Sequence, residues 1–535
     1  MKKNTIRTLT GVLVIIFLFA SSATAFQGNT QRSVKYESLA DEDLDELTDV
    51  TVTVKIDEIR TLEKRDIGLF PVDKIDRFSD PDFYVKVFIN DVEFKSDVWY
   101  NTKYVYGPWE ATLNVPDDQE FVNIKIQLWD WNIGLDKICD ISGDHTGFLD
   151  SYDIELVYSI KTGHWWGDDF AFYESTMSDP SGYGRLNGCD DNSIYQNDRD
   201  CEILFSIYQN DYDNDGIPYW TEVNVYGTDP KVDNRGEDAD ADGIPIEWEH
   251  KWGHYYSEWH DEHWWEYDPF EFNDHANLDP DKDGLDNIEE YLTFQWGSDP
   301  FRQDIFLELD QMEIGPNGEG GFVPDLSKDL LRVAYAKHNI VFHIDDGCMG
   351  GGEKDIEFDP ATTNEELQQI YTDYFIHNDQ NNWRRGVFHY ALIVFNSTRH
   401  SGFVFRTYVN NTYLLDSFVL ATAIHEVGPL YNTPILNILR RKSLNKEYHR
   451  AIDYAGVMMH ETGHTLGIFS WNTPGCDNPR SVFPRSEWLK YRGYRSCMNY
   501  NYVYYMVDYS DGSRGKNDFD DWKRIDLTLF QREGW

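Results

Sequence analysis

The chain has 535 residues, more than one ordinary domain holds, so several domains are expected. Its formal net charge of −48 excludes nucleic acid as a favoured partner, because a polyanion would be repelled. That charge suits a protein that binds cations or stays soluble in high salt, and a hydrophobic fraction of 41% is enough to build packed cores.

The first 25 residues predict a secretory signal peptide. A basic start with Lys2 and Lys3 precedes the apolar run 11–20, and Ala-Thr-Ala at 23–25 is a site for cleavage. A signal anchor is the alternative, but the run is short for spanning a bilayer and no later stretch is long enough. We therefore expect a secreted, extracellular protein without a transmembrane span in its mature form.

The cysteines all lie beyond the cleavage site, and an even count outside the cell permits disulfides in fifteen possible pairings. Local spacing suggests two bridges, and elimination leaves a third pair. Free buried thiols are the alternative. The suggested bridges are Cys189–Cys201 and Cys476–Cys497, and the remaining pair is Cys139 and Cys348.

Residues 26–48 form an acidic leader, either flexible or a short exposed helix. From 49 to 209 the pattern becomes β, with alternating segments at Val50–Ile56, Phe83–Ile89 and Val122–Trp129. Short alternating strands separated by Pro, Asp, Asn and Gly predict a β-sandwich.

Two segments of this region, Ser79–Val87 and Leu128–Asn132, resemble the calcium-loop segments of C2 domains. The resemblance implies that acidic side chains from two loops share calcium, and that the sandwich associates with a surface or membrane. The alternative is ordinary turn chemistry, because Asp and Asn are common in β-turns for their backbone hydrogen bonding alone. The counterparts of the family's ligands are Asp80, Asp82, Asp130, Asn132 and Asp136.

Residues 210–300 contain three copies of D-x-D-x-D-G-x5-E, the twelve-position calcium loop. Carboxylates at positions 1, 3 and 5 converge on the ion, glycine permits the turn, and glutamate at position 12 closes the shell. Residues 201–300 hold 27 acidic and 4 basic residues, so the segment repels itself without cations. The ligands are Asp211, Asp213, Asp215 and Glu222; Asp238, Asp240, Asp242 and Glu249; and Asp279, Asp281, Asp283 and Glu290.

The segment before Asp211 reads as a strand, unlike the entering helix of a sensor EF-hand. The trailing Gly-Thr-Asp-Pro at 227–230 and Gly-Ser-Asp-Pro at 297–300 make the region similar to thrombospondin type 3 repeats. That resemblance implies structural calcium. A solvated, disordered acidic linker is the alternative.

From residue 301 to 535 the pattern becomes α/β. Strands are expected at Asp304–Leu309, Ile340–Ile344 and Gly386–Phe395, and helices at Leu326–His338 and Tyr448–Leu466. A partial motif at His425-Glu426 lacks the second histidine and precedes Pro429, which would break a helix, so we assign it no role.

The last of these helices carries His460-Glu461-Thr-Gly-His464, which matches H-E-x-x-H. Residues four apart share one helix face, so both imidazoles can bind one zinc ion. Glu461 beside them can accept a proton from water that the ion activates. An ordinary amphipathic helix is the alternative.

Gly467 and the segment Ser496-Cys-Met498-Asn-Tyr500 extend the match to H-E-x-x-H-x-x-G and M-x-Y. Residues 301–535 thus resemble metzincin zinc proteases. The resemblance implies a twisted sheet with a long helix, a Met-turn beneath the zinc, and Tyr500 as a hydrogen-bond donor to the oxyanion.

The chain departs from the family pattern at the third zinc ligand. The residue at the position of that ligand is Ser470, whose hydroxyl is a poor ligand for zinc. Asp477, Cys476, Glu487 or an earlier residue could replace it. The expected function is a secreted, calcium-stabilised zinc endopeptidase that hydrolyses protein or peptide substrates. The alternative is a calcium-dependent surface-binding or adhesion protein that carries an inactive metzincin fold.

Overall fold

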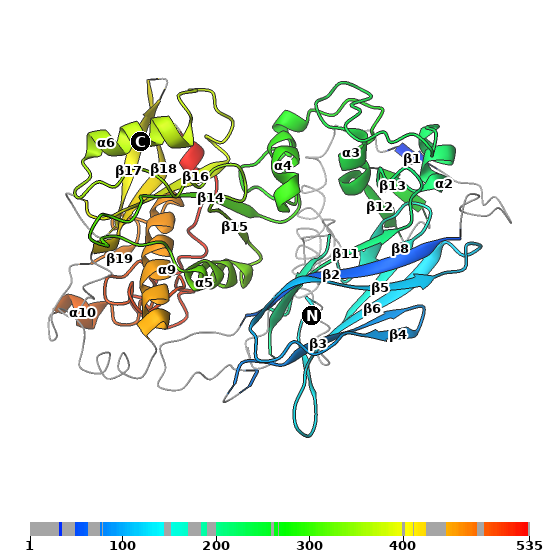
Figure 1. Cartoon of the computed structure of the whole chain (residues 1–535), viewed down its shortest axis with the longest axis horizontal. Coiled ribbons are helices and arrows are strands. Elements are labelled where there is room, and N and C mark those ends of the chain that lie inside the picture. The colour runs from blue at the N-terminus through cyan, green and yellow to red at the C-terminus, as the bar shows by residue number, and fades with distance from the viewer. Residues whose placement is uncertain are drawn as a thin grey trace, which may run out of the picture.

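The computed structural model describes residues 32–34, 49–62, 75–76, 79–143, 151–169, 183–189, 199–257, 262–265, 267–397, 402–409, 411–423, 446–478 and 486–532. Figure 1 shows a β-rich unit at right and an α/β unit at left, with the helix α4 (Asn287–Thr293) between them at the top and α3 (Ile246–Gly253) above the β-rich unit. The expected signal peptide and the His425-Glu426 motif lie outside the described residues.

The β-rich unit is a sandwich of two antiparallel sheets, as predicted. One sheet has the order β10-β11-β2-β5, and the other has the order β4-β3-β6-β8-β9 with β7 paired to β6. Alternate residues of β2, β3 and β6, among them Val54, Val85 and Ile126, meet in one core between the sheets. The strands are β2 (Thr51–Thr61), β3 (Phe83–Ile89), β4 (Val92–Lys95), β5 (Tyr104–Asn114), β6 (Phe121–Asp130), β7 (Lys137–Cys139), β8 (Ile154–Ser159), β9 (Trp165–Gly167), β10 (Arg185–Asn187) and β11 (Cys201–Gln209).

The acidic segment starts directly after β11, so a strand precedes the first loop, as expected. Each twelve-position loop runs into a short helical element that contains its last residue: α2 and η1, then α3, then α4. Residues 32–34 of the acidic leader form a strand that pairs with the insert between the second and third loops. The elements are β1 (Arg32–Val34), α2 (Tyr219–Thr221), η1 (Glu222–Tyr226), α3 (Ile246–Gly253), β12 (His254–Ser257), β13 (Glu262–Trp265), η2 (His275–Asn277), α4 (Asn287–Thr293) and η3 (Phe294–Trp296).

The α/β unit is built on a sheet of order β15-β14-β16-β18-β17. Its strands are parallel except β17, which runs antiparallel to β18 at the edge. All eight residues of β14 are buried, because helices α5 and α9 pack on one face and a second core covers the other. The elements are β14 (Asp304–Gln311), α5 (Asp325–Ala336), β15 (Val341–Asp345), α6 (Asn364–Ile370), η4 (Tyr371–Phe375), β16 (Phe388–Val394), β17 (Gly402–Val409), β18 (Thr412–Ala421), α9 (Lys446–Thr465), β19 (Pro474–Asp477), α10 (Ser486–Lys490) and η5 (Leu529–Gln531).

The three predicted strands and two predicted helices of this unit all form, and each of their ends lies within two residues of the predicted one. The strands β17 and β18 were not predicted. Both views place α9 alongside the sheet, in Figure 1 as the long orange helix below β14 and β16. The unit therefore presents the H-E-x-x-H residues from a helix packed on a twisted sheet.

The two suggested disulfides are not formed. All six cysteines are free thiols, and Cys476 and Cys497 are buried in the core that also contains α9. Local spacing was a poor guide, because buried thiols pack as small apolar side chains whether or not they are paired. Among the described residues, no helix has both the length and the apolar character needed to cross a bilayer.

Candidate metal centres

The two histidines of α9 face one another at the end of the helix. His460 and His464 are 2% and 6% exposed, and their Nε2 atoms are 3.2 Å apart. Each Nδ1 lies against a backbone carbonyl, that of Cys497 at 2.9 Å and that of Ile468 at 2.7 Å. A carbonyl only accepts hydrogen bonds, so both Nδ1 atoms carry the proton. Both Nε2 lone pairs are thereby left for one cation between them.

Asp477 supplies a third donor to the same point. Its Oδ1 lies 3.2 Å from Nε2 of His460 and 3.5 Å from Nε2 of His464. A zinc tetrahedron with bonds of about 2.0–2.1 Å has edges of about 3.3–3.4 Å, so the three separations fit zinc. The backbone of Asp477 is in the left-handed region, at φ 52°, which aspartate tolerates, and its N–H donates to the carbonyl of Met498.

The electrostatics of the three donors agree with this fit. Burial favours the neutral acid, but imidazoles that carry a second proton, at Nε2, donate to Asp477 and hold the pKa of this carboxyl well below its usual range. Burial lowers and the Asp477 hydrogen bond raises the pKa of His460, with a net rise. A carboxylate beside two imidazoles is a donor set in which a divalent cation can take the place of the protons.

Ser470, Cys476 and Glu487 are less suited than Asp477 to be the third ligand. Ser470 is exposed, whereas both imidazoles are buried. Cys476 groups with His464 and Asp477, but burial raises the pKa of its thiol far above its ordinary value. Glu487 lies on α10. The structure thus brings Asp477 to the histidines.

Met498 packs against Gly463 of the motif. Gly463 lies between the two histidines in the sequence, and a Cβ there would stand 2.5 Å from the Met498 sulfur. Only glycine therefore permits this close contact with Met498. Gly467 has φ 95°, which ends α9 and turns the chain toward Asp477. Tyr500 stacks on the His460 ring, with centres 5.4 Å apart.

Glu461 is 4% exposed beside the imidazoles. Burial raises its pKa, which the two imidazoles partly offset. A Cβ on Gly402, the first residue of β17, would lie 2.5 Å from Glu461 Oε1. The carboxylate therefore sits between the metal-site histidines and the edge strand. Burial, followed by the charges of Asp477 and Glu461, also raises the pKa of Tyr500, which keeps its hydroxyl protonated.

The three calcium loops share one backbone geometry. The glycine N–H at position 6 donates to the carboxylate at position 1, and the position-4 residue has φ between 65° and 67°. Hydrogen bonds of this kind turn alternate carboxylates toward a common centre. They run from Gly216 to Asp211 at 2.8 Å, from Gly243 to Asp238 at 3.1 Å and from Gly284 to Asp279 at 3.1 Å.

The same positions of every loop carry buried carboxylate oxygens without a hydrogen-bond partner. Burial, with the neighbouring aspartates, raises the pKa of Glu222 to about 8 and that of Glu249 to about 10. A cation held between such oxygens would satisfy them, and hard oxygen donors suit calcium. They belong to position 3 (Asp213, Asp240, Asp281) and position 12 (Glu222, Glu249, Glu290).

Each loop is also held by residues outside the motif. A backbone N–H from the next segment donates to the position-5 aspartate, and a side chain contacts the position-12 glutamate. The sequence analysis did not identify these residues as partners, although two of them stand in the Gly-Thr/Ser-Asp-Pro segments. The N–H donors are Asn234, Asn273 and Asp304, and the side chains are Thr228, His275 and Ser298.

The third loop is anchored on the α/β unit. Asp304, the first residue of β14, donates its N–H to Asp283 at 2.6 Å. Gln531 donates to the carbonyl of Gly284 at 2.6 Å, and Gln303 donates to that of Asp281 at 3.0 Å. Ion binding at this loop therefore affects the position of β14, an inner strand of the sheet.

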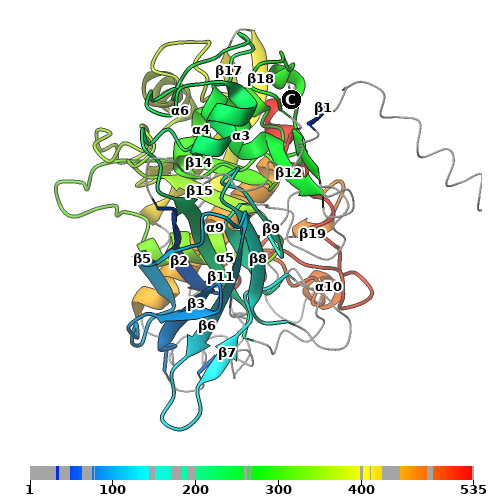
Figure 2. The same cartoon turned by 90° about the vertical axis from the view of Figure 1, so that its right-hand side faces the viewer.

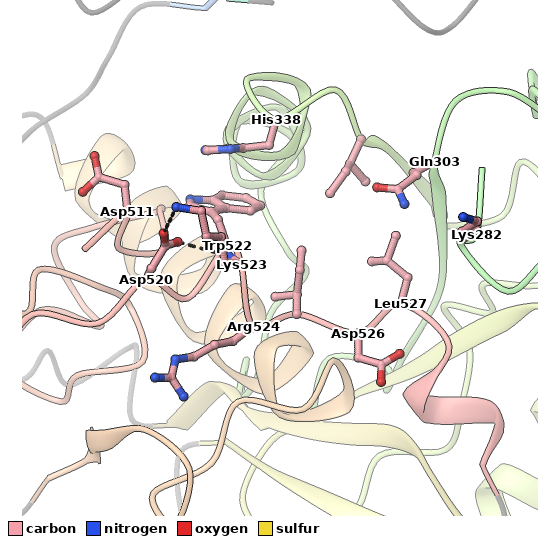
Figure 3. Close-up of a pocket in the computed structure, with 12 residues that line it drawn as sticks. Lys282, Gln303, His338, Asp511, Asp520, Trp522, Lys523, Arg524, Asp526 and Leu527 are labelled. Atoms are coloured by element: carbon pink, nitrogen blue, oxygen red, sulfur yellow. Dashed lines mark hydrogen bonds and ion pairs between the residues drawn. The ribbon is translucent and has the colours of Figure 1, made fainter. Parts of the chain in front are cut away.

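A cavity of about 750 Å³ lies next to that anchor. Figure 3 shows Lys282 of the third loop and Gln303 facing His338 and Trp522, whose rings stack at 3.7 Å. Lys523 pairs with Asp520 at its wall. His460, His464 and Asp477 do not line this cavity, so it is separate from the His460 site.

The sandwich brings four of its five expected calcium ligands together. Asp82 donates its N–H to Asp130 at 3.0 Å, and Asn132 contacts both Asp130, at 2.7 Å, and Asp136, at 3.1 Å. Lys137 lies 3.4 Å from Asp130, so an ammonium group already offsets part of the charge. The fifth residue, Asp80, pairs with Lys103 at 3.5 Å.

The loop from β6 to β7 ends in exposed apolar side chains. Ile133 is 97% and Leu135 87% exposed, and Tyr100, at 65%, meets Trp131 edge to face at its base. Contiguous exposed apolar groups of this kind mark interaction sites.

No family model and no curated protein matches the chain. Solved structures similar to part of it include a C2 domain, with 10% identity over 30% of this chain and 98% of that chain, at a TM-score of 0.17. A C2 domain of plant Extended Synaptotagmin 1 has 16% identity over 30% of this chain and 95% of that chain, at a TM-score of 0.17. Human GIVD cytosolic phospholipase A2 has 13% identity over 30% of this chain, at a TM-score of 0.17, and only 16% of the enzyme is covered. The N-terminal sandwich is the part of the chain with C2 domains among its structural neighbours.

Proposed function

We propose that the protein is a zinc-dependent endopeptidase of the metzincin type, stabilised by calcium at its three acidic loops. The observation that carries the proposal is the convergence of His460, His464 and Asp477, with atom separations of 3.2, 3.2 and 3.5 Å, beside the buried carboxylate of Glu461. Two imidazoles, one carboxylate and an adjacent general base make up the donor set of a hydrolytic zinc site.

Zinc in this position would supply a Lewis acid that polarises the peptide carbonyl. Glu461 accepts the proton of the attacking water and transfers it to the leaving amine nitrogen. Its raised pKa suits a group that must both take up and release a proton. Tyr500, with its hydroxyl kept protonated, donates a hydrogen bond to the oxyanion as charge develops.

The edge strand β17 supports a polypeptide as the substrate. In the described part of the sheet β17 is the outermost strand, and its first residue lies against Glu461. An extended peptide can add to such an edge through main-chain hydrogen bonds, independently of its sequence. This addition would bring a peptide bond next to the general base.

Replacing the third ligand tests the proposal. Asp477→Ala is expected to remove zinc and peptide hydrolysis together, with zinc affinity falling more than about 100-fold, since even an outer-sphere partner is worth about 10–100-fold. Zinc content by atomic emission and cleavage of unfolded casein measure the two effects. Glu487→Ala, on α10, serves as the matched control and should retain both. Zinc binding unchanged in Asp477→Ala would show that the ligand is another residue.

A second candidate function is binding to a membrane surface through the sandwich, with the α/β unit inactive. The observation that favours it is the apolar loop with Ile133 and Leu135 almost fully exposed. Apolar side chains next to aromatic rings suit the boundary between lipid headgroups and acyl chains. Asp130 and Asp136 flank the same loop, so calcium bound there would offset their negative charge next to anionic headgroups.

Vesicle sedimentation checks this candidate. Wild type is expected to sediment with phosphatidylserine-containing vesicles, and Ile133→Ser with Leu135→Ser should bind on the order of 100-fold more weakly, because each buried aliphatic side chain contributes about 1.5–3 kcal/mol. Val92→Ser, at a 44% exposed site of the same sandwich, is the control. Equal sedimentation of the double variant and wild type would remove the candidate.

A further inference from the structure

Two aromatic rings, those of Phe469 and Trp471, lead from the proposed zinc-site imidazole of His464 to the molecular surface. His464 stacks on Phe469 with ring centres 5.5 Å apart and planes within 14°. Phe469 stacks in turn on Trp471 at 4.1 Å and 12°. Phe469 is 6% exposed, whereas Trp471 is 71% exposed. The stack thus begins at a buried metal-site side chain and ends in an open indole face.

The same stack lies along the edge strand. Gly402 of β17 is against Glu461, and Val404 packs with Phe469 in a small apolar cluster. Residues two apart on a strand face the same side and are about 6.6 Å from one another. β17 therefore runs from the general base toward the aromatic rings. A peptide that pairs with this edge carries its side chains past Trp471.

The exposure of Trp471 has a physical consequence. A large apolar ring left in water forgoes the favourable free energy that burial provides. That free energy becomes available when another apolar side chain covers the ring, and aromatic faces favour offset stacking on a second ring. Because Phe469 is fixed between His464 and Trp471, the open face keeps a constant position relative to the metal site.

We propose that Phe469 and Trp471 form a platform that selects an aromatic or other large apolar side chain of the polypeptide substrate near the cleaved bond. The inference rests on the proposed peptidase function and adds a specificity to it. The platform acts by binding one side chain, and the proton transfers at Glu461 do not involve it.

Matched peptides test the platform. Zinc- and calcium-loaded wild type is given pairs that differ only by Phe or Ala at single positions around the cleaved bond. At one position Phe should raise kcat/KM about 10-fold or more, within the range for an apolar subsite. Trp471→Ala should reduce that ratio to about threefold or less, while Trp471→Phe keeps most of it. Trp383→Ala, which removes a 40% exposed tryptophan elsewhere on the unit, should keep all of it.

The outcomes separate the platform from the peptidase. A Phe preference retained in Trp471→Ala overturns the platform and leaves the peptidase intact. If wild type cleaves none of the peptides, their binding to Glu461→Gln and to Glu461→Gln with Trp471→Ala is measured by fluorescence anisotropy. A Phe preference present only in the single variant supports the platform without cleavage. Equal binding by both variants, or none, overturns it.

Discussion

Glu461→Gln is expected to lower kcat for peptide hydrolysis by about 10²–10⁴-fold while zinc remains bound, since general acid–base catalysis typically contributes that factor. The amide keeps the size of the side chain in a site that is 4% exposed, so packing against Gly402 and the imidazoles is preserved. It cannot accept the proton of water. The three donors to zinc are unchanged, because Glu461 is not among them.

The measurement is hydrolysis of a fluorogenic peptide alongside zinc content and thermal melting of the same preparation. Glu357→Gln, at an exposed glutamate of the α/β unit, controls for loss of one negative charge. Wild-type rates in Glu461→Gln would mean that another group activates water. A wild type that binds zinc and cleaves nothing would favour the surface-binding candidate.

Removal of calcium is expected to have the largest effect on stability. A ligand that binds only the folded protein stabilises it by about 2.7 kcal/mol at 100 times its Kd, so three independent sites give roughly 8 kcal/mol. Chelation with EGTA should therefore lower the melting temperature strongly and make residues 210–300 sensitive to protease. The reason is local: six carboxylate oxygens at positions 3 and 12 are buried without a partner.

Without calcium, the stability of the protein is expected to increase as the pH falls. Burial raises the pKa of Glu222 from 4.5 to about 8, so the folded state binds this proton more tightly than the unfolded state. Stability from that group is present below pH 4.5 and is lost as the pH rises toward 8. The melting temperature in EGTA should thus rise on acidification from pH 8 toward pH 5. A melting temperature in EGTA equal to that in calcium at pH 8 would contradict the structural role of the ions.

The third loop extends the consequence of calcium removal to the zinc site. Asp283 of that loop holds the N–H of Asp304, where β14 begins, and β14 is an inner strand of the sheet on which α9 packs. Loss of the ion is therefore expected to loosen the α/β unit as well as the acidic segment. Limited proteolysis with and without EGTA, followed by zinc analysis, measures both.

Local patterns were enough to predict the parts of this protein whose geometry is local. The calcium loops keep their ligands within twelve residues, so spacing alone located Asp211, Asp238 and Asp279 and their partners. The two histidines lie one helical turn apart and were found for the same reason. Alternating and apolar runs also located β3, β6 and β14, because burial of a strand face leaves a period of two and burial of both faces leaves a continuous run.

Only the tertiary structure identified the contacts that form between segments far apart in the sequence. Asp477 reaches His460 only because Gly467 ends α9 and the chain turns back with a left-handed residue at position 477, a path that no ligand spacing encodes. The bonds from Asn273 and Asp304 to the second and third loops cross 31 and 21 residues. The edge position of β17 beside Glu461 and the stacking of Trp471 on Phe469 likewise follow from packing, because side-chain contacts between separate elements leave no periodic signal in the sequence.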